Sequence, residues 1–133
     1  MNYKLSSLQG DFDRNLPNFF EGLEIGDTTL GDGRRIVLFT SKTSLKFLAR
    51  SDCIAMDGTF KITPHPWSQV AIISVEISEE CWIPVAFGLL PDKKRDTYDT
   101  FLGLLKTALT SHNLGLSART VMSDFEVGIE YNL

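Results

Sequence analysis

Hydrophobic and polar positions follow no sustained period over the first 33 residues, where turn-forming residues are frequent. The Leu16-Pro17 pair disfavours a helix through that point, and the LGDG run at 30–33 is a strong turn signal. From residue 34 onward the apolar positions recur with clear periods. We therefore expect an N-terminal extension, partly loop, over 1–33 and a main domain over 34–133.

The main domain begins with RRIVLFT at 34–40, which predicts a strand, and Ser41 then fits the N-cap of a helix over 42–50. Short apolar runs with brief connections next predict three consecutive strands, a pattern typical of an antiparallel meander. A long helix, a fourth strand and a further helix complete the pattern. The expected ranges are 53–56, 69–77 and 83–90 for the three strands, 96–110 for the long helix, 120–122 for the fourth strand and 125–131 for the last helix.

The long helix has one apolar face at helical spacing. That face comprises Tyr98, Phe101, Leu102, Leu105, Ala108 and Leu109. A crossover of this length lets the fourth strand lie parallel to the first of the three. The order β-β-β-α-β-α thus predicts an α/β fold with a ribonuclease H-like mixed sheet. We expect this sheet to be incomplete at its C-terminus and to carry a short N-terminal α/β extension.

Composition narrows the function classes. The 133 residues are 43% hydrophobic and 23% charged, as expected for one globular domain. A net charge of −4 makes the chain a poor free-standing DNA binder, because phosphate contacts need clustered Lys and Arg. No apolar run is long enough for a bilayer, so we expect no membrane partner. Cys53 and Cys81 lack CxxC spacing and the two His residues are scattered, so we expect neither a disulfide framework nor a structural zinc site.

Two aspartates are the candidate chemical groups. Asp57 follows the first of the three strands, and Asp124 follows the fourth. If these strands are parallel neighbours about 4.8 Å apart, both carboxylates come within reach of one divalent cation, with Mg²⁺ the natural choice. Each Asp alone also suits a turn or a helix N-cap, so spacing leaves both interpretations open.

Longer motifs around these aspartates carry a resemblance. MDGTFK at 56–61, followed by IPVAFGLLP at 83–91, is similar to the first blocks of Mutator-like element (MULE) transposases, and VMSDFE at 121–126 resembles their second catalytic block. RRIVLFT at 34–40 resembles a segment often found just upstream. The resemblance covers about residues 34–130.

The resemblance implies a DDE-type nuclease core that cuts and rejoins DNA at transposon ends on Mg²⁺ or Mn²⁺ ions. By position, Asp57 and Asp124 resemble the first two catalytic, metal-binding acids. The family's third acid is a Glu on a later helix, and Glu126 and Glu130 come too early to match it. We therefore assign no third acid, and we expect this chain to be a truncated transposase domain that is inactive alone.

Partners and location follow from the same interpretation. In the complete protein the partner is DNA, which this acidic chain binds weakly, and a transposase or another protein is a second candidate partner. The alternative function is a non-catalytic protein-interaction module derived from a transposase. Lys93-Lys94-Arg95 reads either as a nuclear-import patch or as an exposed turn, giving a nuclear or otherwise cytoplasmic location. Trp67 and Trp82 invite a base-stacking role, but we expect both to be buried against the sheet.

Overall fold

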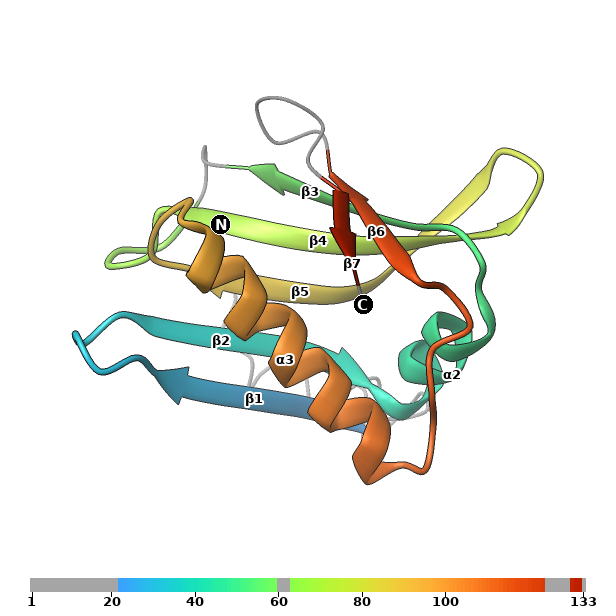
Figure 1. Ribbon diagram of the computed structural model, residues 1–133, viewed down its shortest axis with the longest axis horizontal. Helices are drawn as coiled ribbons and strands as arrows, with labels where there is room; N and C mark the ends of the chain where they lie inside the picture. The colour runs from blue at the N-terminus through green and yellow to red at the C-terminus, as the bar shows by residue number, and fades with distance from the viewer. Residues whose placement is uncertain (1–21, 60–62, 124–129, 133) are drawn as a thin grey trace, which may run out of the picture.

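A computed structural model describes residues 22–59, 63–123 and 130–132, which form a single mixed sheet with helices on one face (Figure 1). The elements, in chain order, are β1 (Leu23–Thr29), β2 (Arg35–Ser41), α2 (Lys42–Arg50), β3 (Ile54–Thr59), β4 (Gln69–Ser78), β5 (Cys81–Leu90), α3 (Arg95–Ser111), β6 (Thr120–Ser123) and β7 (Glu130–Asn132).

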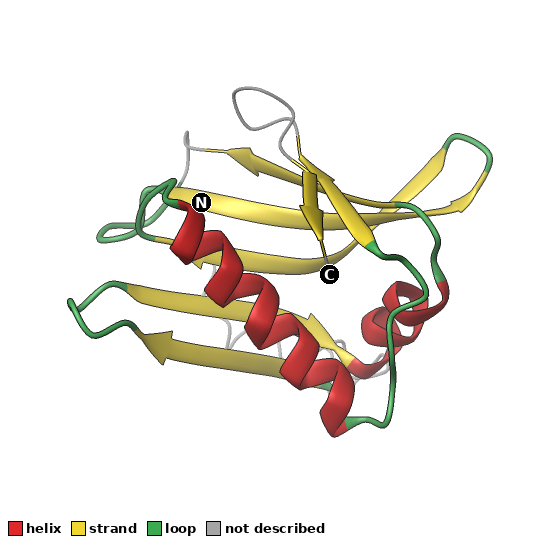
Figure 2. Cartoon of the chain, in the orientation of Figure 1, coloured by secondary structure: helices red, strands yellow, loops and turns green. Residues whose placement is uncertain are grey.

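The sheet has the strand order β1-β2-β5-β4-β3-β6-β7. β3 and β6 pair in parallel, and the other neighbours are antiparallel. The meander β3-β4-β5 and the parallel pairing of the fourth predicted strand with the first are as the sequence predicted. α3 supplies the crossover between them and lies across the sheet in Figure 2. The α/β fold class is confirmed.

The two helices of the described residues bury their apolar sides in one common core. Residues of α2 such as Leu45 and residues of α3 such as Phe101 pack with the alternate buried residues of β4. Ser41 caps α2, since its side-chain oxygen accepts a hydrogen bond of 3.1 Å from the Ser44 N–H. The predicted apolar face of the long helix is also correct, with Ala108 alone only partly buried.

α3 approaches the sheet closely at Gly88 of β5. A Cβ built on Gly88 would lie 2.4 Å from Cε1 of the Phe101 ring, which is completely buried. Real Cβ atoms do not come this near to another carbon, so a residue without a side chain is required here. Gly88 therefore sets how deeply Phe101 packs and where α3 crosses the sheet.

The opposite face of the sheet carries no helix of the described part. Residues of β4 alternate between buried and half-buried positions, and the half-buried set points to this open face. Large hydrophobic side chains on β1, β5 and β6 remain exposed, including Ile25 at 61%, Phe87 at 42% and Met122 at 68%. We call this the open face of the sheet.

Three strand assignments differ from the sequence prediction. β1 was not predicted, because Gly26 and Asp27 weaken its strand propensity, and its pairing with β2 supplies the stability. β3 continues to Thr59 instead of ending at residue 56, since its last residues still pair with β4. The helix predicted over 125–131 is wrong at residues 130 and 131, which belong to β7 and pair with β6. Residues 125–129 lie outside the described residues.

Candidate functional site

Asp57 lies inside β3, opposite Ile72 of β4, and its side chain is exposed. Its Oδ1 atom accepts a hydrogen bond of 2.7 Å from the Gly58 N–H. The interpretation of Asp57 as a turn former is wrong, because the strand continues for two residues beyond it. The carboxylate therefore stands on a regular, paired strand, which holds its backbone in place.

β6 brings the second motif next to the first. Ala55 pairs with Met122, and Met56 pairs with Ser123, in the parallel ladder of β3 and β6. Asp124 is the residue after Ser123 in the sequence and lies outside the described residues. The structure thus places the two strand segments side by side and describes one of the two predicted acids.

A hollow of about 500 Å³ surrounds this pair of strands. Its lining residues are Ala55, Met56, Asp57, Ser74, Trp82, Met122 and Ser123. Trp82 is 45% exposed, so the expectation that it is buried against the sheet is wrong. Trp82 pairs with Glu76, which belongs to the half-buried set of β4, so its side chain lies on the open face. The hollow combines one carboxylate with an exposed aromatic ring and an exposed Met.

Trp67 behaves differently from Trp82. It is half-buried, and its indole Nε1–H donates a hydrogen bond of 2.9 Å to the Arg35 carbonyl oxygen. The Arg35 guanidinium carbon lies 5.5 Å from the centre of the ring, within the range of a cation–π contact. Trp67 therefore serves to attach the segment before β4 to β2.

The donor set for a metal is incomplete in the described part of the chain. Within residues 22–59, 63–123 and 130–132, no three His, Cys, Asp or Glu side chains gather where they could hold a metal ion. Asp57 supplies one hard carboxylate oxygen ligand of the kind that Mg²⁺ prefers. A divalent cation at Asp57 would need ligands in addition to those that the described residues supply.

An ionic cluster within the described part of the chain surrounds Arg34, the first residue of the RRIVLFT run. Its Nη2 lies 2.6 Å from Oδ2 of Asp96, its Nε lies 2.8 Å from Oδ2 of Asp32, and its Nη1 lies 3.3 Å from Oδ2 of Asp92. These contacts connect the β1–β2 turn, the end of β5 and the first turn of α3. Arg34 thus forms ion pairs with three aspartates of the protein itself.

The same contacts shift the titration of the aspartates. Hydrogen bonds from Arg34 lower the pKa of Asp96 below its ordinary value, because they favour the charged carboxylate. Partial burial by itself raises the pKa of Asp92. Hydrogen bonds from the Thr97 hydroxyl, the Lys94 N–H and Arg34 outweigh that effect, so the pKa of Asp92 is lowered.

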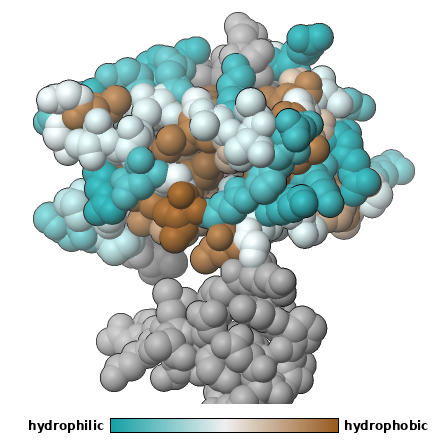
Figure 3. Space-filling view, turned by 90° about the horizontal axis from the view of Figure 1, so that it is seen from below, coloured by the Kyte–Doolittle hydropathy of each residue, from teal (hydrophilic) through white to brown (hydrophobic). Residues whose placement is uncertain are grey.

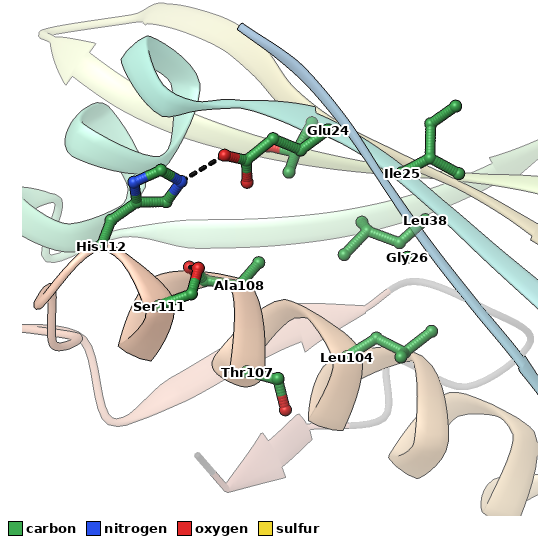
Figure 4. A pocket seen from close by; sticks show the side chains of 10 residues that line it. Glu24, Ile25, Gly26, Leu38, Leu104, Thr107, Ala108, Ser111 and His112 are labelled. Carbon is green, nitrogen blue, oxygen red and sulfur yellow. Dashed lines mark hydrogen bonds and ion pairs between the residues drawn. The ribbon is translucent and has the colours of Figure 1, made fainter.

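A second hollow, of about 470 Å³, lies between β1 and α3 (Figure 4). Its lining residues are Glu24, Ile25, Gly26, Leu38, Thr40, Leu104, Thr107, Ala108, Ser111 and His112. At one end, Nε2 of His112 and Oε1 of Glu24 are in close hydrogen-bonding contact. Sequence reasoning missed this hollow. The Leu23-Glu24-Ile25 alternation was its one local signal, and His112 lies just beyond the last residue of α3.

Comparisons of the chain with protein-family models, with curated proteins and with solved structures found no match. None of the helices in the described ranges is long and apolar enough to cross a membrane.

Proposed function

We propose that this chain contributes the first two acids, Asp57 and Asp124, to a ribonuclease H-like catalytic domain of a MULE-type DDE transposase. In the complete protein these carboxylates hold Mg²⁺ or Mn²⁺ for the cleavage and joining of DNA strands. The observation that carries the proposal is the parallel pairing of β3 with β6, in which Met56 lies opposite Ser123. Each proposed acid is the next residue in the sequence.

Two acids on adjacent paired strands would repel each other unless a cation lies between them. Adjacent strands are about 4.8 Å apart, so acids at matching positions on both strands come within reach of one cation. Two carboxylates about 4 Å apart repel by roughly 4 kcal/mol at an effective dielectric constant near 20. A divalent cation offsets this repulsion, which is why such pairs are typical of metal sites.

The metal supplies the reaction chemistry when it is bound, since a pair of ions stabilises the attacking and leaving oxygens of a phosphodiester. The chain's own part is to hold carboxylate oxygens in place. Asp57 is suited to this because both flanking residues pair with β4 and Gly58 fixes one of its oxygens. The resemblance implies a third acid, and two carboxylates alone bind Mg²⁺ weakly. We therefore expect no DNA cleavage by residues 1–133 alone.

The direct test is a Mn²⁺ titration of the chain followed by electron paramagnetic resonance. We expect weak, saturable binding of one ion that Asp57→Asn and Asp124→Asn each abolish. Asp52→Asn is the matched control, because Asp52 is also exposed and lies just before β3 but outside the hollow. Equal Mn²⁺ binding by Asp57→Asn and the unmodified chain would sink the proposal. So would metal-dependent nicking of DNA that survives the Asp57→Asn change.

The open face favours a second candidate function, that of a non-catalytic protein-interaction module. Phe87 of β5 and Met122 of β6 are both exposed on this face, and exposed apolar side chains are a feature of partner sites. The test is sedimentation of the chain at rising concentration. Association that Phe87→Lys removes and Asp57→Asn leaves unchanged supports an interaction role. Association that Phe87→Lys does not alter argues against it.

A further inference from the structure

The hollow between β1 and α3 is separate from the hollow at Asp57. Three strands, β2, β5 and β4, lie between β1 and β3 in the sheet. Seen from the β1 side, hydrophobic residues are exposed between hydrophilic surfaces (Figure 3). Nothing in the proposed nuclease function uses this part of the molecule.

Two features keep the space open. Gly26 of β1 faces α3 without a side chain, and a Cβ built there would lie 3.4 Å from Cβ of Leu38 and 3.7 Å from Cδ2 of Leu104. On the helix, Ala108 presents only a methyl group to the hollow. The resulting volume of about 470 Å³ lies within the range of ligand pockets, roughly 300–1,000 Å³.

The walls are mostly apolar and the polar groups gather near one end. Leu38 and Leu104 come from opposite sides of the space, while Glu24 and His112 close one end of it (Figure 4). These two are the titratable groups among the lining residues, and they pair with each other. The Glu24 carboxylate places a negative charge at this end of the hollow, so an anionic ligand is repelled.

The lining hydroxyls add a second constraint, since each already donates its hydrogen to a backbone carbonyl. Thr40 donates to Val85 at 2.9 Å, Thr107 to Gly103 at 3.0 Å, and Ser111 to Ala108 at 2.7 Å. These hydroxyl oxygens can still accept hydrogen bonds, and the Glu24 carboxylate also acts only as an acceptor. The polar groups of the hollow therefore suit a ligand that donates a hydrogen bond.

We propose that the hollow between β1 and α3 binds a small, uncharged, largely apolar molecule that carries one hydrogen-bond donor, about the size of two fused aromatic rings. The apolar body packs between Leu38 and Leu104, and the donor group points to Glu24. This site is independent of any metal or nucleic acid.

The test uses the whole chain and three related probes. 2-Naphthol is uncharged and has one O–H donor, naphthalene lacks the donor, and 2-naphthoate is an anion of similar size. We expect saturable binding of one 2-naphthol per chain and about tenfold weaker binding of naphthalene, the factor for one hydrogen bond to a charged group. We expect 2-naphthoate to show no saturable binding. Protein amide NMR shifts should be confined to β1, β2 and the second half of α3.

Matched variants separate the hollow from other surfaces. Gly26→Leu fills the space and should weaken the binding of 2-naphthol at least tenfold. Gly31→Leu is the control, because it makes the same change in a turn with open space around it and should leave binding unchanged. Glu24→Gln should lower the affinity for 2-naphthol to nearly that for naphthalene. Far-UV circular dichroism checks folding, and Ala108→Leu fills the hollow from the helix side if Gly26→Leu does not fold.

Three results would overturn the proposal. The first is 2-naphthol binding that neither cavity-filling variant reduces. The second is equal binding of all three probes, or no saturable binding of 2-naphthol. The third is binding that disappears in Phe87→Lys, because Phe87 belongs to the open face and not to this hollow.

Discussion

Replacing Gly88 by Ala tests the closest approach of helix and sheet. The added Cβ would lie 2.4 Å from Cε1 and 2.7 Å from Cζ of the Phe101 ring. Carbon atoms in contact prefer about 3.5–4.0 Å, so the ring and the new methyl group overlap by more than about 1 Å. Phe101 is fully buried and cannot turn into solvent. The helix or the strand must shift instead.

The magnitude follows from overpacking in a closed core, which costs about 1–3 kcal/mol and occasionally more. We expect Gly88→Ala to lose about 3 kcal/mol of unfolding free energy. This is a large share of the roughly 5–15 kcal/mol that stabilises a domain. In urea, with an m-value of about 1–3 kcal/mol per molar, the unfolding midpoint should fall by at least about 1 M.

The assay is urea unfolding followed by circular dichroism, with two reference variants. Gly103→Ala lies on the exposed side of α3 with open space around it, so we expect it to gain about 0.5–1 kcal/mol from helix propensity. Phe101→Leu combined with Gly88→Ala should lose less stability than the sum of the single changes, because the smaller side chain makes room for the methyl group. A Gly88→Ala midpoint equal to that of the unmodified chain would refute the reasoning.

Three further predictions concern the polar contacts. Arg34→Met should destabilise the chain more at pH 7 than at about pH 3. In the folded chain the pKa values of Asp92 and Asp96 are lowered from the ordinary value of 3.8. Their charged carboxylates therefore stabilise the fold at pH values above 3.8, and this stabilisation is lost as the pH falls through the lowered pKa values. Urea unfolding at several pH values measures the difference in unfolding free energy between Arg34→Met and the unmodified chain. A difference that does not change with pH contradicts the role given to these ion pairs. Gln69→Leu removes buried hydrogen bonds to the Asp92 carbonyl oxygen and the Tyr98 hydroxyl, so it should cost about 2 kcal/mol in the same assay, and an unchanged midpoint argues against this role. Ser41→Ala should cost about 1 kcal/mol through loss of the α2 cap, with Ser41→Asn keeping most of the stability.

Local pattern determined much of the fold. The apolar face over 96–110 became α3, and the β-branched run over 69–77 became β4, each within about two residues of its predicted ends. Such elements can be predicted because the residues that form the buried face recur at the period of the element itself. The Ser41 cap and the order of elements from β3 to β6 are local in the same sense.

Non-local pairing decided what the pattern missed. β1 is a weak strand sequence that forms because β2 supplies hydrogen-bond partners, and β7 forms along the free edge of β6. A two-turn helix has little stability alone, so strand pairing can override its periodicity, as it does at residues 130 and 131. The LGDG turn at 30–33 was a local signal for the β1–β2 connection, whereas the short β7 has no comparable signal in the described residues.

Some features of the candidate sites follow from local sequence, and others depend on how distant segments pack. The sequence by itself singled out Asp57 and Asp124, since their motifs are contiguous, and it predicted that their strands are parallel neighbours. Only the tertiary structure showed that Asp57 lies inside a strand and that Trp82 is exposed near it. It also showed that Arg34 forms ion pairs with Asp32, Asp92 and Asp96. It also formed the hollow between β1 and α3, at one end of which Glu24 contacts His112, 88 residues away in the chain. Contacts between distant segments depend on where whole elements pack, and no local spacing encodes that.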